Sequence, residues 1–197
     1  MTIRAVVPLV ALASLGGLAA VTARPATARP ASRGFYADVG LGATGLLGDA
    51  RHDAAIGPVL ALRVGEDLTS WASVGVAVSA SSHEATVPPP PEGEWLQLYQ
   101  ARVELRLGGR AGAFAWFVDG GAGGAYVSSN LLEKVGVLDP GERGSLAVAA
   151  GAGLEYQLQN RHYALGVAAG WWLLPAFNGL QGVEGRAFLR YTYGGAH

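Results

Sequence analysis

The residues best suited to catalysis form one local cluster, Ser82-His83-Glu84. A serine, a histidine and an acid are the groups of a nucleophilic hydrolase, in which the histidine removes the proton of the serine. Neighbouring residues of an extended chain point to opposite sides, so these three side chains do not form a triad by themselves. Ser128 and Ser129 lie at another predicted loop edge, away from His162. The sequence therefore predicts that the protein is not an enzyme.

A second motif, Gly40-Leu41-Gly42-Ala43-Thr44-Gly45, matches the G-x-G-x-x-G pattern of dinucleotide-binding proteins. That pattern requires a helix directly after it and an acidic residue about 20 positions further on. Residues 46–53 contain another glycine and no helical period. We interpret the match as a chance feature of a glycine-rich strand and expect no cofactor.

Metal binding is also not indicated. The chain has no cysteine, and its four histidines, His52, His83, His162 and His197, show no spacing typical of metal ligands. His52 and His83 both fall in predicted loops on one side of the molecule, but nothing else supports a metal site there. We expect all four to be surface histidines.

The composition excludes several classes of protein. Half of the 197 residues are hydrophobic, 15% are charged and 30 are glycine. The charged fraction is well below the about 25% of an ordinary soluble domain. A chain this apolar is not disordered, and a net charge of −1 does not suit a nucleic-acid-binding protein.

The N-terminal residues 1–28 have the features of a secretory signal peptide. Arg4 precedes an apolar run over residues 5–20, and small residues favour cleavage after Ala23 or Ala28. The remaining chain is then expected to work outside the cytoplasm. Its longest uncharged stretch, residues 163–183, contains Pro175 and several polar residues, so no transmembrane helix is predicted.

The dominant pattern in the rest of the chain has a period of two. From Tyr99 to Leu107, apolar and polar residues alternate, as on the two faces of a β-strand. Eight such segments can be drawn, separated alternately by short turns and longer loops, and each is long enough to cross a bilayer as a tilted strand. We predict an all-β fold, an eight-stranded antiparallel up-and-down transmembrane barrel over residues 34–193, with a tail at 194–197. The predicted strands are 34–44, 55–65, 68–81, 94–108, 112–127, 144–158, 162–174 and 183–193.

Charge and side-chain size indicate which face lies inside. The less apolar face carries rows of glycine and alanine together with five acids and five bases. One Arg or Lys on the lipid face at mid-bilayer costs about 2–4 kcal/mol, so this face is expected to fill the lumen, with its charges paired. The ten residues are Asp38, Arg63, Arg102, Glu104, Arg106, Asp119, Glu155, Glu184, Arg186 and Arg190.

Aromatic residues near the ends of the apolar stripes predict two girdles at the membrane interfaces. One set is Phe35, Phe114, Trp116, Tyr156, Tyr163, Tyr191 and Tyr193, and the other is Trp95, Tyr99, Tyr126 and Trp171. Four other aromatic residues, Trp71, Phe117, Trp172 and Phe188, point inward by their position in the alternation.

With a signal peptide, eight alternating strands, alternating loop lengths and the terminal Phe188-Leu189-Arg190-Tyr191-Thr192-Tyr193, the chain resembles small outer-membrane barrels of the OmpX and OmpA transmembrane-domain type. Such proteins usually end on an aromatic residue read by the insertion machinery, whereas this chain continues to His197. The resemblance implies the outer membrane of a Gram-negative bacterium. Its implied partners are membrane lipids, lipopolysaccharide and the barrel-assembly machinery.

Three functions remain open from the sequence. A structural or surface-interaction role through loops such as 82–93 and 128–143, with an envelope or surface protein as a partner, is expected because no catalytic constellation is found. A narrow channel, or a barrel that binds a small ligand or lipid, is the alternative, since lumen glycines leave gaps. A lipid A-modifying enzyme is the third.

Overall fold

The computed structural model describes residues 33–86, 95–128 and 143–194, and the predicted signal peptide lies outside them. Over these residues the chain forms eight strands and one short 3-10 helix. The elements are β1 (Gly34–Leu46), η1 (Gly48–His52), β2 (Gly57–Asp67), β3 (Ala72–Glu84), β4 (Trp95–Ala111), β5 (Phe114–Val127), β6 (Gly144–Gln157), β7 (Tyr163–Leu174) and β8 (Leu180–Gly194).

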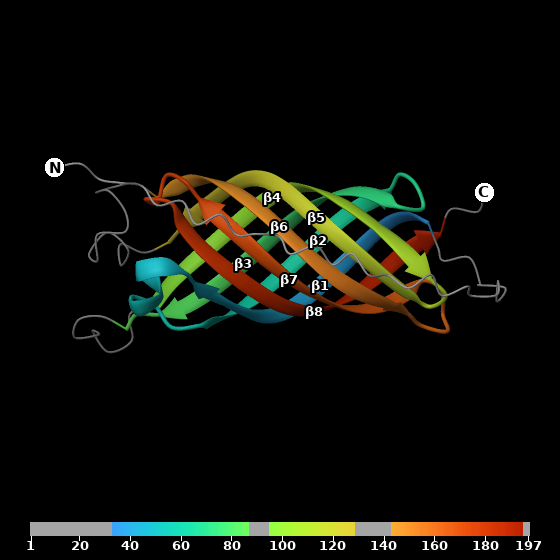
Figure 1. The fold of residues 1–197 in the computed structure, drawn as a ribbon, viewed down its shortest axis with the longest axis horizontal. Helices are drawn as coiled ribbons and strands as arrows, with labels where there is room; N and C mark the ends of the chain where they lie inside the picture. Colours follow the sequence, from blue (N-terminus) through green and yellow to red (C-terminus); the bar gives the residue numbers. More distant parts are fainter. Residues whose placement is uncertain (1–32, 87–94, 129–142, 195–197) are drawn as a thin grey trace, which may run out of the picture.

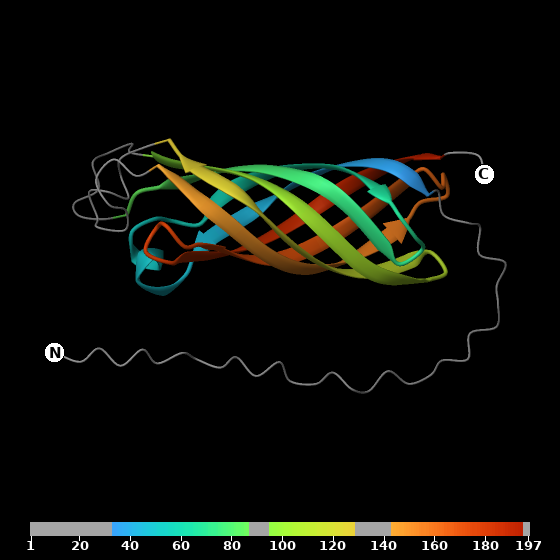
Figure 2. The same ribbon diagram turned by 90° about the horizontal axis from the view of Figure 1, so that it is seen from above.

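The strands close into a barrel (Figures 1 and 2). Each strand pairs antiparallel with the next, and β8 pairs with β1 from Gly34↔Gly194 to Leu46↔Gly182. The predicted eight-stranded up-and-down barrel is therefore confirmed. No helix in the described part of the chain is long and apolar enough to cross a membrane.

The two ends of the barrel differ. At one end, called here the turn end, β1 begins, β8 ends and three short turns connect the strands, on the right in Figure 1. At the other, the loop end, lie the connections after β1, β3, β5 and β7. Three of the four connections at the loop end are longer than the turns, as the sequence predicted, but the connection between β7 and β8 is only residues 175–179, because β8 begins at Leu180 and not at residue 183.

Several strand boundaries differ from the prediction. Glu66 and Asp67, predicted as a turn, are the last residues of β2, and β3 begins only at Ala72. The turn is residues 68–71, where the hydroxyl of Thr69 accepts hydrogen bonds from the backbone N–H groups of Trp71 and Ala72. A threonine hydroxyl can stabilise a turn in this way, and that local bond shifts the boundary by several residues. Trp71, expected to point inward, is 58% exposed at this turn.

The strands place apolar side chains outside and small or polar ones inside. Leu62 and Val64 on β2 are more than half exposed, while Arg63 between them is 2% exposed. This arrangement inverts that of a soluble barrel, whose apolar side chains fill the interior.

The loop end contains an apolar cluster that the sequence did not predict. The chain after β7 turns back through Asn178 and Gly179, whose φ angles of 49° and 72° lie in the left-handed region, and Phe177 is completely buried. We call this cluster the apolar stopper; its larger members are Leu46, Leu96, Leu98, Val127, Trp172, Leu174, Phe177 and Leu180. It contains residues of the loops as well as of the strands, so these connections are held inside the barrel mouth.

Candidate functional site in the barrel lumen

The ten charged residues that the sequence assigned to the lumen all lie on inward positions of their strands. Seven are buried, with at most 9% of their surface exposed. The other three, Asp119, Glu184 and Arg186, are half-buried, and 8–12% of their side-chain surface is accessible.

A central chain of ion pairs links four strands. Arg63 on β2 lies 3.5 Å from Glu104 and 3.9 Å from Asp119. Arg106 lies 3.6 Å from the same oxygen of Asp119 and 3.9 Å from Glu155. These separations are longer than the about 2.7–2.9 Å of a direct charge-assisted hydrogen bond, so the central groups attract one another mainly by charge.

The network continues toward the turn end through two residues that the sequence placed in turns. Arg190 donates hydrogen bonds to both carboxylate oxygens of Asp67 at 2.7 Å, and it lies 3.7 Å from Glu155. Arg110 lies 3.5 Å from Glu155. Asp67 and Arg110 keep the inward alternation of β2 and β4, so extending those two strands by a few residues would have found them.

Two more pairs lie toward the loop end, each between residues two positions apart on one strand. Arg102 lies 3.2 Å from Glu104 and also donates to Gln100 on β4. Arg186 on β8 donates to Glu184. Because residues two positions apart in a strand point to the same face, both pairs are fixed by the alternation alone.

Several buried polar atoms in the centre have no hydrogen-bond partner within the described residues. They include all three guanidinium nitrogens of Arg63, and one carboxylate oxygen each of Asp38, Glu104 and Asp119. Asp38 lies in register between Arg63 and Arg190 on the two neighbouring strands. Because unpaired buried charges are costly, this geometry favours water molecules as bridges between the groups.

Three inward-pointing aromatic rings lie among the residues of the network. The guanidinium carbon of Arg106 is 3.7 Å from the centre of the Phe117 ring, and that of Arg190 is 3.8 Å from the centre of the Tyr36 ring. The rings of Phe117 and Phe188 are 6.0 Å apart. We call Tyr36, Phe117 and Phe188 the aromatic layer; cation–π attraction to the two arginines holds it in place.

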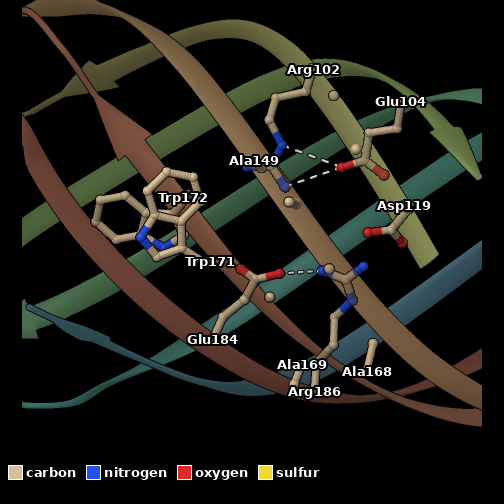
Figure 3. Close-up of a pocket in the computed structure, with 15 residues that line it drawn as sticks. Arg102, Glu104, Asp119, Ala149, Ala168, Ala169, Trp171, Trp172, Glu184 and Arg186 are labelled. Atoms are coloured by element: carbon tan, nitrogen blue, oxygen red, sulfur yellow. Dashed lines mark hydrogen bonds and ion pairs between the residues drawn. The ribbon is translucent and has the colours of Figure 1, made fainter. Parts of the chain in front are cut away.

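A small cavity lies between the ion pairs and the apolar stopper (Figure 3). Its charged lining is Arg102, Glu104, Asp119, Glu184 and Arg186, and Trp172 borders it. The facing wall consists of glycines and alanines of β5, β6 and β7, whose small side chains leave the space free. The cavity has room for about one water molecule.

The eleven residues predicted to form aromatic girdles all lie on outward positions. Most are strongly exposed; Tyr191 and Trp171 are half-buried. At the turn end, Tyr191 packs against Tyr163 and Tyr193 with ring centres 4.8 and 4.6 Å apart. Tyr99 lies opposite Tyr126 toward the loop end.

The expectation that His83 lies on the surface is wrong. β3 extends through Glu84, and His83 on its inward face is completely buried. Its Nδ1 lies 3.0 Å from the carbonyl oxygen of Ala55 and its Nε2 lies 3.1 Å from Ser81 Oγ. The prediction failed because the strand is longer than its alternation suggested. The pair Ser81–His83 lies inside the barrel, and Ser82 and Glu84 point elsewhere.

The glycine motif serves packing between two strands. Gly40 to Gly45 lie within β1, and a Cβ atom on Gly42 would come within 2.7 Å of the Arg186 backbone on β8. Close packing of β1 on β8 therefore requires this glycine. Among the described residues, no three His, Asp or Glu side chains are grouped to hold a metal ion.

Comparison with known proteins agrees with this architecture. Residues 10–175 match the model of the outer membrane protein beta-barrel domain. The chain belongs to this family. No curated protein sequence matches it significantly.

Solved structures of similar fold include Neisserial surface protein A, with a TM-score of 0.60 and 14% identity over 84% of this chain and all of that one. Ail, the attachment invasion locus protein of Yersinia pestis, in its complex with the heparin analogue sucrose octasulfate, has a TM-score of 0.53 and 13% identity over 81% of this chain and 98% of that one. At this level of identity the likeness shows the fold alone.

Proposed function

We propose that this outer-membrane barrel has a closed lumen and acts through its loop end, which faces the outside of a Gram-negative cell, in a structural or surface-interaction role. The observation that carries the proposal is the filling of the lumen along its length. The aromatic layer lies against arginines of the ion-pair network, which reaches the turn end through Asp67 and Arg110, and the apolar stopper fills the loop end.

The partners proposed with this role follow from the surfaces of the molecule. Membrane lipids and lipopolysaccharide surround the apolar strands, and the barrel-assembly machinery inserts them. An envelope or surface protein is the proposed partner of the loop end. No catalytic role is proposed, because the serine–histidine pair of the described residues is buried.

A loop-deletion experiment tests the surface role. Residues 87–94 and 129–142 are each replaced by a short glycine-serine linker, and the variants are returned to a strain that lacks the gene. We expect them to assemble, as judged by a gel mobility that changes on boiling, but not to restore cell adhesion, aggregation or resistance to a hydrophobic dye. Full restoration of every phenotype would overturn the role of the loops.

The alternative role as a narrow channel is tested separately. The purified barrel in a planar bilayer is expected to show no conductance, because three layers of side chains close the lumen. Stable single-channel currents would favour the channel instead. A lipid A-modifying activity would appear as an altered lipid A mass on overexpression, and we expect an unchanged spectrum.

A further inference from the structure

The small cavity beneath the apolar stopper has two unlike walls. Charged residues of β4, β5 and β8 form one wall, and alanines and glycines of β5, β6 and β7 form the other. The charges of Arg102 and Glu104, and of Glu184 and Arg186, are largely neutralised within each pair. The cavity, called here the chamber, is therefore a polar space with room for about one water molecule, and the unsatisfied carboxylate oxygens of Glu104 and Asp119 belong to its lining residues.

The chamber is closed on its turn-end side by side chains that are locked together. Arg106 lies over the Phe117 ring, and the Phe188 ring contacts both Phe117 and the backbone of Gly166. All of these residues belong to strands, and each strand is bonded to two neighbours along its length. Opening this side requires breaking sheet pairing or buried ion pairs, both of which are costly.

On the loop-end side, the chamber is closed partly by a residue that lies outside the strands. Trp172 borders the chamber, and Phe177 packs into the same apolar cluster from the connection between β7 and β8. This connection spans only residues 175–179, and the hydrogen bonds between its backbone groups are local, while one bond, from the Ala176 N–H to Ser145 Oγ, ties its backbone to β6. A short connection outside the sheet opens at a lower free energy than paired strands do.

We propose that the chamber is a blind pocket that opens only at the loop end, with Phe177 as its removable plug, and that it exchanges its water from that side. The proposal goes beyond the surface role proposed above and does not depend on it. A pocket with one entrance conducts nothing, in agreement with a closed lumen.

Single-cysteine labelling tests the proposal directly, because the chain has no cysteine of its own. Ala168 on β7 lines the chamber, and Ala168→Cys places a thiol there. Ala164 lies four residues away on the same strand, beyond Gly166 and the Phe188 ring, and is 2% exposed. Ala164→Cys is therefore the matched reporter for the far side of the aromatic layer.

Each reporter is combined with Phe177→Ala and with the conservative Phe177→Leu, and is reacted with sulfonatoethyl methanethiosulfonate. The thiolate displaces methanesulfinate from the reagent and forms a mixed disulfide. Phe177→Ala is expected to raise the labelling rate of Ala168→Cys by about tenfold or more, since local opening becomes easier. Phe177→Leu and the Ala164→Cys reporter are expected to show no such increase.

Two results would overturn the proposal. Equal labelling of Ala168→Cys with and without Phe177 means that Phe177 is not the plug, whether both rates are fast or slow. A matching rise at Ala164→Cys means that the pocket is not blind. Gel mobility before and after boiling verifies folding of every variant, and Ala149→Cys on β6 replaces any Ala168→Cys protein that does not fold.

Discussion

The ring of Phe188 on β8 lies against the backbone of Gly166 on β7, inside the barrel. A Cβ atom on Gly166 would be 2.6 Å from Phe188 Cε1 and 2.7 Å from the carbonyl oxygen of Leu154. The same relationship joins Phe117 to Gly153, Tyr36 to Gly65 and Trp172 to Gly182. Lumen glycines therefore leave room for specific aromatic rings.

This relationship predicts that Gly166→Ala destabilises the barrel. The added methyl group overlaps a ring on one side and a backbone oxygen on the other, and overpacking of this kind costs about 1–3 kcal/mol. Urea unfolding in detergent micelles or lipid vesicles measures the change. Gly185→Ala is the matched control, because a methyl group added at Gly185 would meet no atom within 4 Å; if both variants unfold alike, the ring contact has no energetic role.

The contact of Arg190 Nη2 with both carboxylate oxygens of Asp67 gives a second prediction. Arg190→Met removes the arginine that bonds Asp67 and one of the three arginines near Glu155, and breaking a buried ion pair costs about 3–5 kcal/mol. The double variant Arg190→Met/Asp67→Leu is expected to recover part of this loss in the same unfolding experiment. Arg161→Met, at an exposed turn, is the control; a double variant no more stable than the single one would contradict the pairing.

The residues that line the lumen can be predicted from the sequence in the middle of each strand but not at its ends. In the middle of the strands, alternation alone assigns the inward charges, since Arg63 and Arg102 stand between exposed apolar neighbours. At the strand ends, hydrogen bonds of turns shift the boundaries, so Asp67, Arg110 and His83 were misplaced. The apolar stopper has no local signal, because the burial of Phe177 depends on how a loop folds back over strands distant in sequence.

The buried bond between Ser81 and His83 gives a third prediction. Ser81→Ala leaves His83 Nε2 without this partner in a site with no exposed surface, and an unsatisfied buried group costs about 1–3 kcal/mol. The unfolding midpoint is expected to fall accordingly. Ser82→Ala, at the next residue but on the other face of β3, is the control and is expected to leave the midpoint unchanged. If Ser82→Ala lowered the midpoint more than Ser81→Ala, the bond between Ser81 and His83 would not contribute to stability.

The apolar exterior gives the last prediction. Leu62 in the middle of β2 is 52% exposed and Leu68 in the turn is 57% exposed, so the two residues differ in depth rather than in exposure. If the outward face contacts lipid, Leu62→Arg costs about 2–4 kcal/mol, whereas Leu68→Arg at the membrane edge costs about 0–1 kcal/mol. Refolding into lipid vesicles, followed by gel mobility, measures both. In a bilayer, the free-energy cost of a charge depends on its depth. An equal loss of folded protein for the two variants would therefore contradict contact of the outward face with lipid.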